Sequence, residues 1–346
     1  MSGAVDPIVG SLTTRYTPAG PLDLRLTLRP LRHGAGDPSA HLMADGGWLA
    51  FHTPRGSVTL ALTQRPDGDV VAHAWGEGAE WAINSVPQLC GAGDEDDGVD
   101  LRRHPAVAHA AARFPGLRLT RSNRVLDALV PAVLEQEITA TEALGAWQTL
   151  VRQHGTPAPG PMVREGFGVV PEGSGAVPEG SGAVGEGFGA RIIPSGLRVA
   201  PTAAAWAAMP SWDFRQAGIT QRRWNLVQLA ASRQVQLERT LRLGRGGPEV
   251  DRVLRALPGI GVWTSALIRQ RAHGDPDAPA FGDAHISRGV CWVLAKELLP
   301  AAEADQRMAE LLEPWAGQRQ RVVALLLAAG AEAPRRGPRA SIPTHR

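Results

Sequence analysis

Short runs of alternating apolar and polar residues mark the first hundred residues, and this period of two is typical of half-buried β-strands. The runs lie at residues 22–28, 48–53, 57–63 and 70–75. The second and third flank the turn Pro54-Arg55-Gly56, so they predict a β-hairpin. Residues 77–89 carry apolar positions at helical spacing. Residues 1–100 are therefore expected to form an α+β domain with an antiparallel sheet.

Beyond residue 104 the apolar positions recur every three to four residues, which is the spacing of helices that bury one face. This spacing predicts helices at residues 107–114, 124–137, 141–154, 202–209, 220–233, 234–243, 250–257, 262–271, 287–299, 303–312 and 318–329. Thr139 or Thr141 is in position to cap the third of these helices. The chain is expected to be mostly α, with a helical body over residues 101–331.

A repetitive segment interrupts the helical pattern. Residues 170–176 read Val-Pro-Glu-Gly-Ser-Gly-Ala, and residues 177–183 repeat them. A segment so rich in glycine, proline and serine cannot bury a core. Residues 160–195 are therefore expected to be a flexible insertion tolerated between two helices, with a functional lid as the alternative. The basic tail at residues 332–346 is expected to be disordered.

Composition narrows the class of protein. Of the 346 residues, 43% are hydrophobic and 20% are charged, as in ordinary globular proteins. The sequence has no apolar run long enough to span a bilayer and no secretory signal pattern, so a cytoplasmic location without membrane contact is expected. Cys90 and Cys291 are the only cysteines, which excludes a disulfide framework and a four-cysteine iron–sulfur cluster. No cofactor requirement is expected.

Charge is distributed unevenly along the chain. Residues 1–100 carry an excess of acidic residues, and residues 196–346 carry an excess of basic ones. A polyanionic partner is therefore expected to dock on the second half of the chain. The acidic run Asp94-Glu95-Asp96-Asp97 is expected to be a solvated loop rather than a metal site.

Two short helical patterns at residues 250–257 and 262–271 are separated by a tight turn. Pro258, Gly259 and Gly261 end the first pattern, because proline and glycine break helices and glycine adopts backbone angles that other residues avoid. Such a turn exposes backbone N–H groups at the start of the second helix, where they and the helix dipole favour an anion such as a DNA phosphate. For an isolated turn of this kind, an ordinary corner between two helices is the alternative.

The residues around the turn resemble a known superfamily. Residues 257–264 read Leu-Pro-Gly-Ile-Gly-Val-Trp-Thr, and Gly282-Asp283 follow them. This arrangement resembles the helix-hairpin-helix DNA glycosylases, above all the 3-methyladenine DNA glycosylase II type of alkylation repair. Further similarity lies at residues 114–119, 128–139 and 217–223. The resemblance covers about residues 101–331, and it implies a helical glycosylase core with its helix-hairpin-helix at 250–271, preceded by the sheet domain.

The resemblance assigns the central chemical role to Asp283. Cleavage of an N-glycosidic bond builds positive charge on the sugar, so a nearby carboxylate stabilises the transition state and can activate a water. An Asp before a helix is by itself more often an N-cap, and the two roles are compatible.

The same resemblance implies that the hairpin binds both the DNA backbone and a monovalent cation. Backbone contacts with DNA are expected from Gly259, Ile260, Gly261, Val262 and Thr264, with help from Arg255, Arg269 or Arg288. The backbone carbonyls of Arg255, Leu257 and Ile260 are implied as ligands of a structural Na⁺ or K⁺.

Trp263 takes the position at which bifunctional relatives carry their amine nucleophile. An indole cannot form a Schiff base, and the single lysine of the chain, Lys296, lies elsewhere. Excision is therefore expected to be monofunctional. The Trp263 ring instead offers a face on which a cationic N-alkylated purine can stack.

The base pocket implied by the resemblance consists of Trp263, Gln136, Leu267 and His285. Gln136 matches a family residue near the gap left by the flipped base. Glu137 departs from the apolar wedge of well-known members, so the wedge is Ile138 or lies on another loop. Leu267 stands where some members have an aromatic residue.

Taken together, the sequence predicts a monofunctional, metal-independent DNA glycosylase that acts as a monomer on duplex DNA with a flipped damaged base. The expected substrates are alkylated purines such as 3-methyladenine and 7-methylguanine. A noncatalytic helix-hairpin-helix DNA-binding protein is one alternative, although such a protein has no need of Asp283. A glycosylase for oxidised or mismatched bases is another, and the missing lysine and cysteine cluster count against its usual forms.

Overall fold

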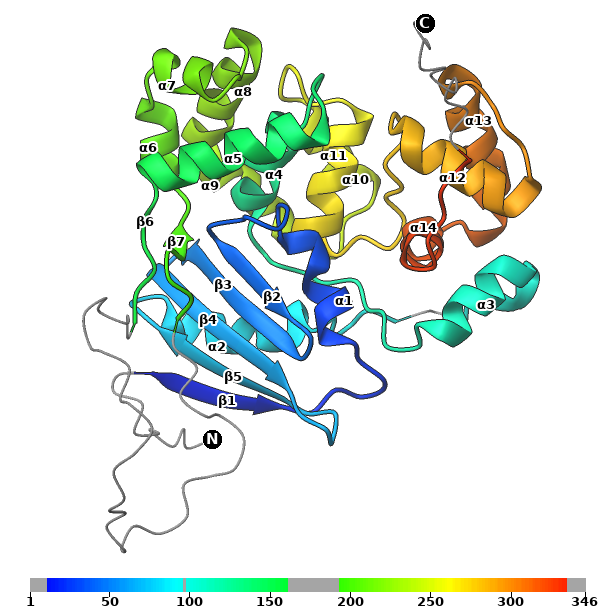
Figure 1. The fold of residues 1–346 in the computed structure, drawn as a ribbon, viewed down its shortest axis with the longest axis horizontal. Helices are drawn as coiled ribbons and strands as arrows, with labels where there is room; N and C mark the ends of the chain where they lie inside the picture. Colours follow the sequence, from blue (N-terminus) through cyan, green and yellow to red (C-terminus); the bar gives the residue numbers. More distant parts are fainter. Residues whose placement is uncertain (1–10, 96–97, 161–192, 335–346) are drawn as a thin grey trace, which may run out of the picture.

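The computed structural model describes residues 11–95, 98–160 and 193–334 (Figure 1). An antiparallel sheet lies at the lower left of Figure 1, and helices lie above it and to its right. The expectations for the repeats of residues 170–183 and for the tail beyond residue 334 fall outside the described residues. The predicted fold class, mostly α with an N-terminal antiparallel-sheet domain, is confirmed.

The sheet contains five strands in the order β1-β5-β4-β3-β2, and each pair of neighbours is antiparallel. The strands are β1 Leu12–Tyr16, β2 Ala40–Met43, β3 Gly46–Thr53, β4 Gly56–Gln64 and β5 Val70–Trp75. The predicted hairpin is confirmed as β3 and β4, with Thr53 paired to Gly56 across the turn. Leu49, Leu60 and Ala72 belong to the core on one face, which α1 (Leu24–Leu28) and α2 (Ala79–Leu89) cover. Trp48 and Trp75 stack at 5.6 Å on the other face.

The strand predicted at residues 22–28 is wrong, because the chain forms helix α1 (Leu24–Leu28) there. Leucines at positions 24 and 28 satisfy both a period of two and a helical turn, so alternation alone does not separate the two structures. The Asp23 side chain decides the outcome by accepting a 2.9 Å hydrogen bond from the Leu26 N–H, as an N-cap does. Leu24, Thr27 and Leu28 are then buried on one side of the helix.

The remaining helices form two groups around separate cores. They are α3 Pro105–Arg113, α4 Val125–Leu134, α5 Ala140–His154, α6 Ala203–Ala208, α7 Ser211–Gln216, α8 Gln221–Ser232, α9 Gln234–Glu238, α10 Pro248–Arg255, α11 Val262–Ile268, α12 Ala284–Ala295, α13 Ala301–Leu312 and α14 Arg319–Ala328. Helix α4 is the centre of the first group, since every residue in it except Asp127 is buried. Residues from α5 to α11 pack in the same core, whereas α3 and α12–α14 share the second. The orange and red helices on the right of Figure 1 are α12–α14.

Helix ends differ from the predicted ones where capping and tertiary contacts intervene. Thr139, not Thr141, caps α5, and Glu142 completes a capping box. The helix predicted at residues 234–243 ends at Glu238 and continues as a 3₁₀ turn over Arg239–Leu243. A short helix, α7, lies where none was predicted.

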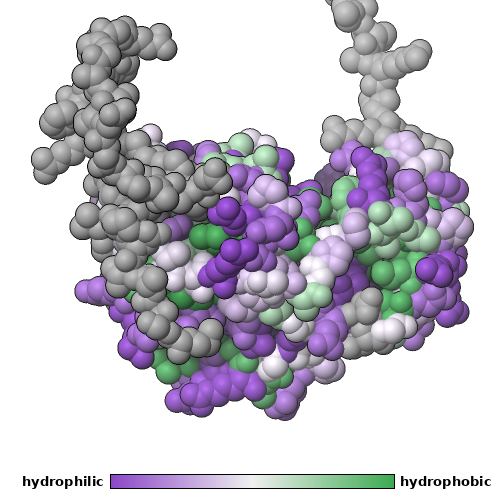
Figure 2. All heavy atoms as spheres, turned by 90° about the horizontal axis from the view of Figure 1, so that it is seen from below, coloured by the Kyte–Doolittle hydropathy of each residue, from purple (hydrophilic) through white to green (hydrophobic). Residues whose placement is uncertain are grey.

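The described residues contain features that can be compared with the expectations drawn from composition. No helix in the described ranges is long and apolar enough to cross a membrane. Figure 2 shows hydrophilic and hydrophobic residues intermixed over one face of the molecule. Cys90 and Cys291 are both buried and unbonded to one another. Within the residues described, no cluster of three or more His, Cys, Asp or Glu side chains is placed to hold a metal ion.

Candidate active site

The predicted helix-hairpin-helix is formed by α10, a tight turn, and α11. Gly259 has φ of +98°, a backbone conformation that favours glycine. A Cβ at this position would also lie 3.0 Å from Leu226 Cδ2, so both backbone and space favour glycine. Gly261 is extended and precedes α11, whose first backbone hydrogen bond runs from Ser265 N to Gly261 O. The N–H groups of the first turn therefore have no partner within the helix and are available to an anion.

Gln136 braces this hairpin from the loop between α4 and α5. Its side-chain amide donates to the Gly259 carbonyl at 3.1 Å and to the Thr264 hydroxyl at 2.9 Å. Gln136, predicted to lie near the gap left by a flipped base, contacts the glycine turn itself. This contact ties the end of the central helix α4 to the start of α11.

The residues next to Gln136 have different environments. Glu137 is exposed, has φ of +61°, and pairs with Arg222 at 2.8 Å. Ile138 is half-buried and packs against the first helical core. Glu137 therefore faces solvent, whereas Ile138 is partly covered by the helical core.

Asp283 caps the start of α12. Its Oδ1 accepts hydrogen bonds from His285 N at 3.0 Å and from Ile286 N at 3.2 Å. Oδ2 has no hydrogen-bond partner in the described part of the chain, and the side chain is half-buried at the helix start. The carboxylate is thus fixed by one oxygen and presents the other.

The turn that carries Asp283 is anchored to α13 by Asp305. The Asp305 Oδ2 accepts a 2.7 Å hydrogen bond from Gly282 N, and its other oxygen contacts the Ser287 hydroxyl. Ser287 Oγ also lies 2.9 Å from the carbonyl oxygen of Asp283. Gly282 has φ of +95°, so a left-handed glycine precedes the acid. Sequence reasoning missed Asp305, and nothing in the pattern of α13 distinguishes it from a solvated acid.

Trp263 connects the hairpin to the turn of Asp283. A Cβ placed on Gly282 would lie 3.4 Å from the Cβ of Trp263, so the first turn of α11 and the residue before Asp283 are in contact. Trp263 is half-buried, Leu267 is buried in the core beneath it, and His285 is exposed on the first turn of α12. The structure therefore brings Trp263 next to Gly282, the residue before Asp283, while Gln136 contacts Gly259 and Thr264 of the same hairpin.

Of the arginines suggested as helpers of the hairpin, Arg269 is held in ion pairs within the protein. Its side chain is 12% exposed and pairs with Asp275 at 2.6 Å and with Asp251 at 3.5 Å. Arg255 is accessible and has an ion pair with Asp251 at 3.2 Å, one helical turn away. Arg288 is half-buried, and its Nε has no acceptor among the described residues. Arg255 is thus the most accessible of the three.

His273 lies behind the hairpin helix, on the π-helical turn Arg269–His273 that continues α11. Burial, with the charges of Arg121 and Arg269, lowers the pKa of this imidazole to about 4. The ring is therefore neutral near pH 7 and contacts the Thr240 hydroxyl at 3.0 Å. The other ring nitrogen, Nδ1, is buried without a hydrogen-bond partner among the described residues.

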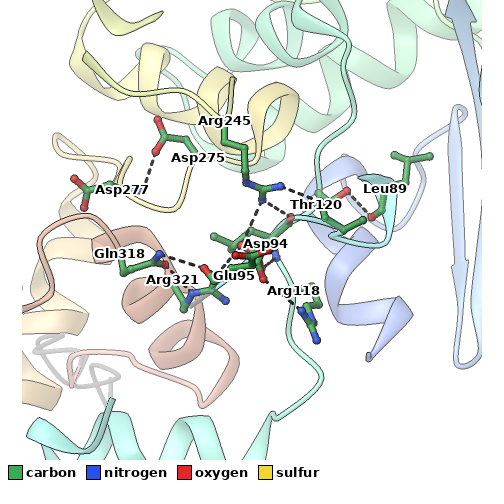
Figure 3. Close-up of polar contacts among 12 residues, drawn as sticks. Leu89, Asp94, Glu95, Arg118, Thr120, Arg245, Asp275, Asp277, Gln318 and Arg321 are labelled. Carbon is green, nitrogen blue, oxygen red and sulfur yellow. Dashed lines mark hydrogen bonds and ion pairs between the residues drawn. The ribbon is translucent and has the colours of Figure 1, made fainter. Parts of the chain in front are cut away.

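A buried polar cluster holds the two helical groups together. Asp94 accepts hydrogen bonds from Arg321 Nη2 at 2.6 Å and from Leu119 N at 2.7 Å, and Arg245 Nη2 lies 3.4 Å away (Figure 3). Arg321 belongs to α14, and Arg245 precedes α10. The solvated loop predicted for the acidic run is wrong for Asp94, whose side chain is 1% exposed, because two arginines from distant segments reach it.

A second connection lies beside this cluster. Asp275 accepts hydrogen bonds from Arg269 and from Gly247 N, both at 2.7 Å. Asp277 pairs with Arg319 of α14. The loop after α11 therefore connects the hairpin helix to α14.

Comparison with known proteins is informative only at the level of structure. No protein-family model matches the chain, and no curated protein matches its sequence. A 3-methyladenine DNA glycosylase from Archaeoglobus fulgidus superposes with a TM-score of 0.66 at 16% identity, covering 91% of this chain and 97% of that one. An 8-oxoguanine glycosylase/lyase from Clostridium acetobutylicum, in complex with duplex DNA, superposes with a TM-score of 0.58 at 13% identity, covering 95% and 99%.

These matches extend over nearly the whole chain, including the sheet domain and the hairpin. They confirm at the level of fold the resemblance seen in residues 257–264 and 282–283. The chain has the fold of the helix-hairpin-helix DNA glycosylases.

Proposed function

We propose that this protein is a monofunctional DNA glycosylase that removes alkylated purines, such as 3-methyladenine and 7-methylguanine, from duplex DNA. The observation that carries the proposal is the contact between Trp263 and Gly282, which sets the hairpin helix beside the turn of Asp283. A phosphate-binding turn, an aromatic face and a carboxylate with a free oxygen then adjoin one another.

The proposed reaction uses each of these groups. The first-turn N–H groups of α11, from Gly261 to Thr264, bind a phosphate of the strand that holds the lesion. As the bond from the base nitrogen to C1′ breaks, its electrons leave with the base and the sugar becomes cationic. Asp283 Oδ2 stabilises this charge and accepts a proton from the water that adds to C1′. The products are a free base and an abasic site.

Substrate preference follows from the charge of the base. An N-alkylated purine is already cationic, so its departure needs no protonation by the protein. The indole of Trp263 attracts such a cationic ring more strongly than a neutral one. In this proposal Leu267, which is buried in the core against which Trp263 packs, supports the indole, and His285 and Gln136 complete the base pocket. The similarity to a 3-methyladenine glycosylase agrees with this preference.

Strand cleavage is not part of the proposed activity, because a lyase needs an amine at the sugar. The single lysine, Lys296, ends α12, whereas Asp283 begins it. The twelve residues of α12 separate the two by about 18 Å. The Lys296 ammonium instead lies 5.4 Å from the centre of the Trp292 ring.

A structural Na⁺ or K⁺ at the hairpin is part of the same proposal. Backbone carbonyl oxygens suit such hard cations. The Leu257 carbonyl accepts a hydrogen bond from Ile260 N at 3.1 Å and keeps its second lone pair. The carbonyls of Arg255 and Ile260 accept no hydrogen bond among the described residues, so the donor set fits the ion. When bound, the ion would neutralise part of the phosphate charge.

The proposed function is tested by incubating the full chain with a panel of duplexes. The panel contains 3-methyladenine, 7-methylguanine, 8-oxoguanine and unmodified DNA. Free 3-methyladenine or 7-methylguanine is expected, with no strand nick before alkaline treatment. Release of 8-oxoguanine alone, or a nick without treatment, would assign the protein to the oxidised-base class instead. Binding without release of any base would make it a noncatalytic DNA-binding protein.

Asp305 is expected to act as a positioning residue for Asp283. Asp305→Ala removes the acceptor of Gly282 N, so kcat for base release is expected to fall about tenfold while KM stays near the wild-type value. Asp305→Asn keeps one carbonyl oxygen and is expected to recover most of kcat. Single-turnover kinetics with methylated duplex measure both constants.

The matched control for Asp305 is Glu310→Ala, which removes another acid of α13 that pairs only with neighbouring surface groups of that helix. This control is expected to release base at the wild-type rate. Equal kcat in Asp305→Ala and Glu310→Ala, or equal loss in the Ala and Asn variants at position 305, would contradict the positioning role.

A further inference from the structure

A cavity of about 1000 Å³ lies between the sheet domain and the helical core. Its walls come from the β3–β4 turn, from one face of α2, from the start of α4, and from α9 with the 3₁₀ turn that follows it. Cavities of this size at domain interfaces are typical of sites for small organic ligands. Exposed arginines at positions 55, 239 and 242 form its rim, and the side chains of Arg124, Asp127 and Glu238 form its floor.

The cavity is separate from the candidate active site. Asn123 and Arg124 line it at the start of α4, whereas Gln136 follows the other end of that helix and contacts the hairpin. The ten residues of α4 span about 15 Å. Neither Trp263 nor Asp283 is among the residues that line the cavity.

Unpaired arginines mark the rim. Arg239 and Arg242 are exposed, and neither has a hydrogen bond or an ion pair within the described ranges. Arg55 is the third rim arginine, and its nearest acid is Glu80 at 4.0 Å. Guanidinium groups bind phosphate through paired N–H donors. The rim therefore suits the phosphate of a ligand.

The floor has the opposite character. Glu238 accepts hydrogen bonds from Val125 N at 3.0 Å and Leu126 N at 3.2 Å, which caps α4. Burial raises the pKa of Glu238 to about 7. Asp127 lies beside it and faces Arg124 Nε at 3.4 Å. A carboxyl group that is partly protonated near neutral pH can both accept and donate a hydrogen bond, so a ligand that reaches the floor needs polar groups there.

Arg124 adds a positive charge to the floor. Its guanidinium carbon lies 3.6 Å from the centre of the Phe51 ring, and the stacking fixes its orientation. Its Nη1 is buried and has no hydrogen-bond acceptor in the part of the chain described. This nitrogen is enclosed by protein atoms, so the contribution of Arg124 to the cavity is the positive charge of its stacked guanidinium beside Asp127.

The side wall is formed by α2. Asn84 and Gln88 follow one another along this wall, with the half-buried indole of Trp81 next to them. Amides can donate and accept, and an indole offers a flat apolar surface. A flat heterocycle with both donors and acceptors matches this wall better than a bare anion or an aliphatic chain does.

We propose that this cavity binds a nucleoside monophosphate, with its phosphate on Arg239 and Arg242 and its base or sugar on Glu238, Asp127 and Arg124. A ligand with an anionic end and a hydrogen-bonding end satisfies both parts of the cavity at once. Inorganic phosphate would engage the rim alone, and a nucleoside would engage the floor alone.

The test measures binding to the full chain by titration calorimetry. The probes are AMP, dAMP, GMP, adenosine and inorganic phosphate. At least one monophosphate is expected to bind with a stoichiometry of one and at least about tenfold more tightly than adenosine or phosphate. The double variant Arg239→Ala/Arg242→Ala is expected to weaken this binding at least about tenfold. Its thermal unfolding should match the wild type, since both side chains are exposed and unpaired.

The matched control is Arg102→Ala/Arg103→Ala, which removes two adjacent exposed arginines that do not line the cavity. This variant is expected to bind the nucleotide as the wild type does. Base release from methylated duplex should be unchanged in both double variants. Because the calorimetry measures nucleotide binding and not base release, it can succeed or fail whatever the outcome for the proposed glycosylase activity.

Three outcomes would overturn the inference. The first is that no monophosphate binds the wild-type protein. The second is that a monophosphate binds equally to the wild type and to Arg239→Ala/Arg242→Ala, which would locate the site elsewhere. The third is that this variant loses affinity only for duplex DNA, in which case the rim is an extension of the DNA-binding surface.

Discussion

Asp283→Asn is expected to lower the rate of base release by at least about a hundredfold, because the neutral amide cannot offset the charge that builds on the sugar. Asparagine is as good an N-cap as aspartate, and its oxygen can still accept from His285 N and Ile286 N. The substitution therefore removes the charge and keeps the helix start. Single-turnover release of 3-methyladenine or 7-methylguanine measures the effect.

The controls for Asp283 separate chemistry from folding. Affinity for a duplex with an abasic site and the unfolding temperature are both expected to stay near the wild-type values in Asp283→Asn. Asp283→Ala also removes the cap, so it is expected to lose about 1 kcal/mol of stability besides the activity. Base release by Asp283→Asn at the wild-type rate would show that another group carries the reaction, and the proposed mechanism would fail.

Asp94→Ala is expected to be among the most destabilising single substitutions, at about 3–5 kcal/mol of unfolding free energy. The cause is the burial of Arg321, whose guanidinium would lose its carboxylate at 2.6 Å, together with the lost partners of Leu119 N and Arg245. Breaking a buried ion pair on one side leaves an uncompensated charge. Equilibrium unfolding in urea measures the loss.

Two further variants define the origin of this loss. Asp94→Asn keeps an acceptor for Leu119 N or Arg321, so a smaller loss is expected than for alanine. Glu249→Ala removes an exposed acid whose pair with Arg252 at 3.6 Å is solvated, and a change within about 0.5 kcal/mol is expected. If Asp94→Ala unfolded at the same urea concentration as Glu249→Ala, the cluster would not hold the helical groups together.

Local sequence was sufficient to predict the hairpin and the capping role of Asp283, although the helix predicted at residues 287–299 in fact begins at Ala284 and ends at Ala295. Glycines at 259 and 261 and the proline at 258 constrain the backbone directly, and Asp283 before an apolar helix is a local cap signal. The β3–β4 hairpin was predictable for the same reason, since its turn residues and alternation lie within a few residues of one another. Local signals failed at α1, where leucines 24 and 28 fit two periods equally well.

The contacts that were not predictable join residues far apart in the chain. Gln136 reaches Gly259, and Asp94 reaches Arg321, across more than a hundred residues. Two residues in such a long-range contact have no characteristic separation in the sequence. The identity of a polar residue also does not show whether its side chain will be buried or exposed to solvent. Asp305 is of the same kind, because its partner Gly282 N is a backbone group. The fold was therefore predictable at the level of segments, and the support of the site was not.

The two-stranded ladder of β6 (Thr156–Pro157) and β7 (Arg198–Val199) sets where residues 161–192 leave and rejoin the described fold. A Cβ on Gly160 would lie 2.8 Å from Ile193 Cδ1, so the two ends of the interval already touch. The described residues on either side of this interval, 156–160 and 193–199, therefore fix both of its end points by their own pairing and contact.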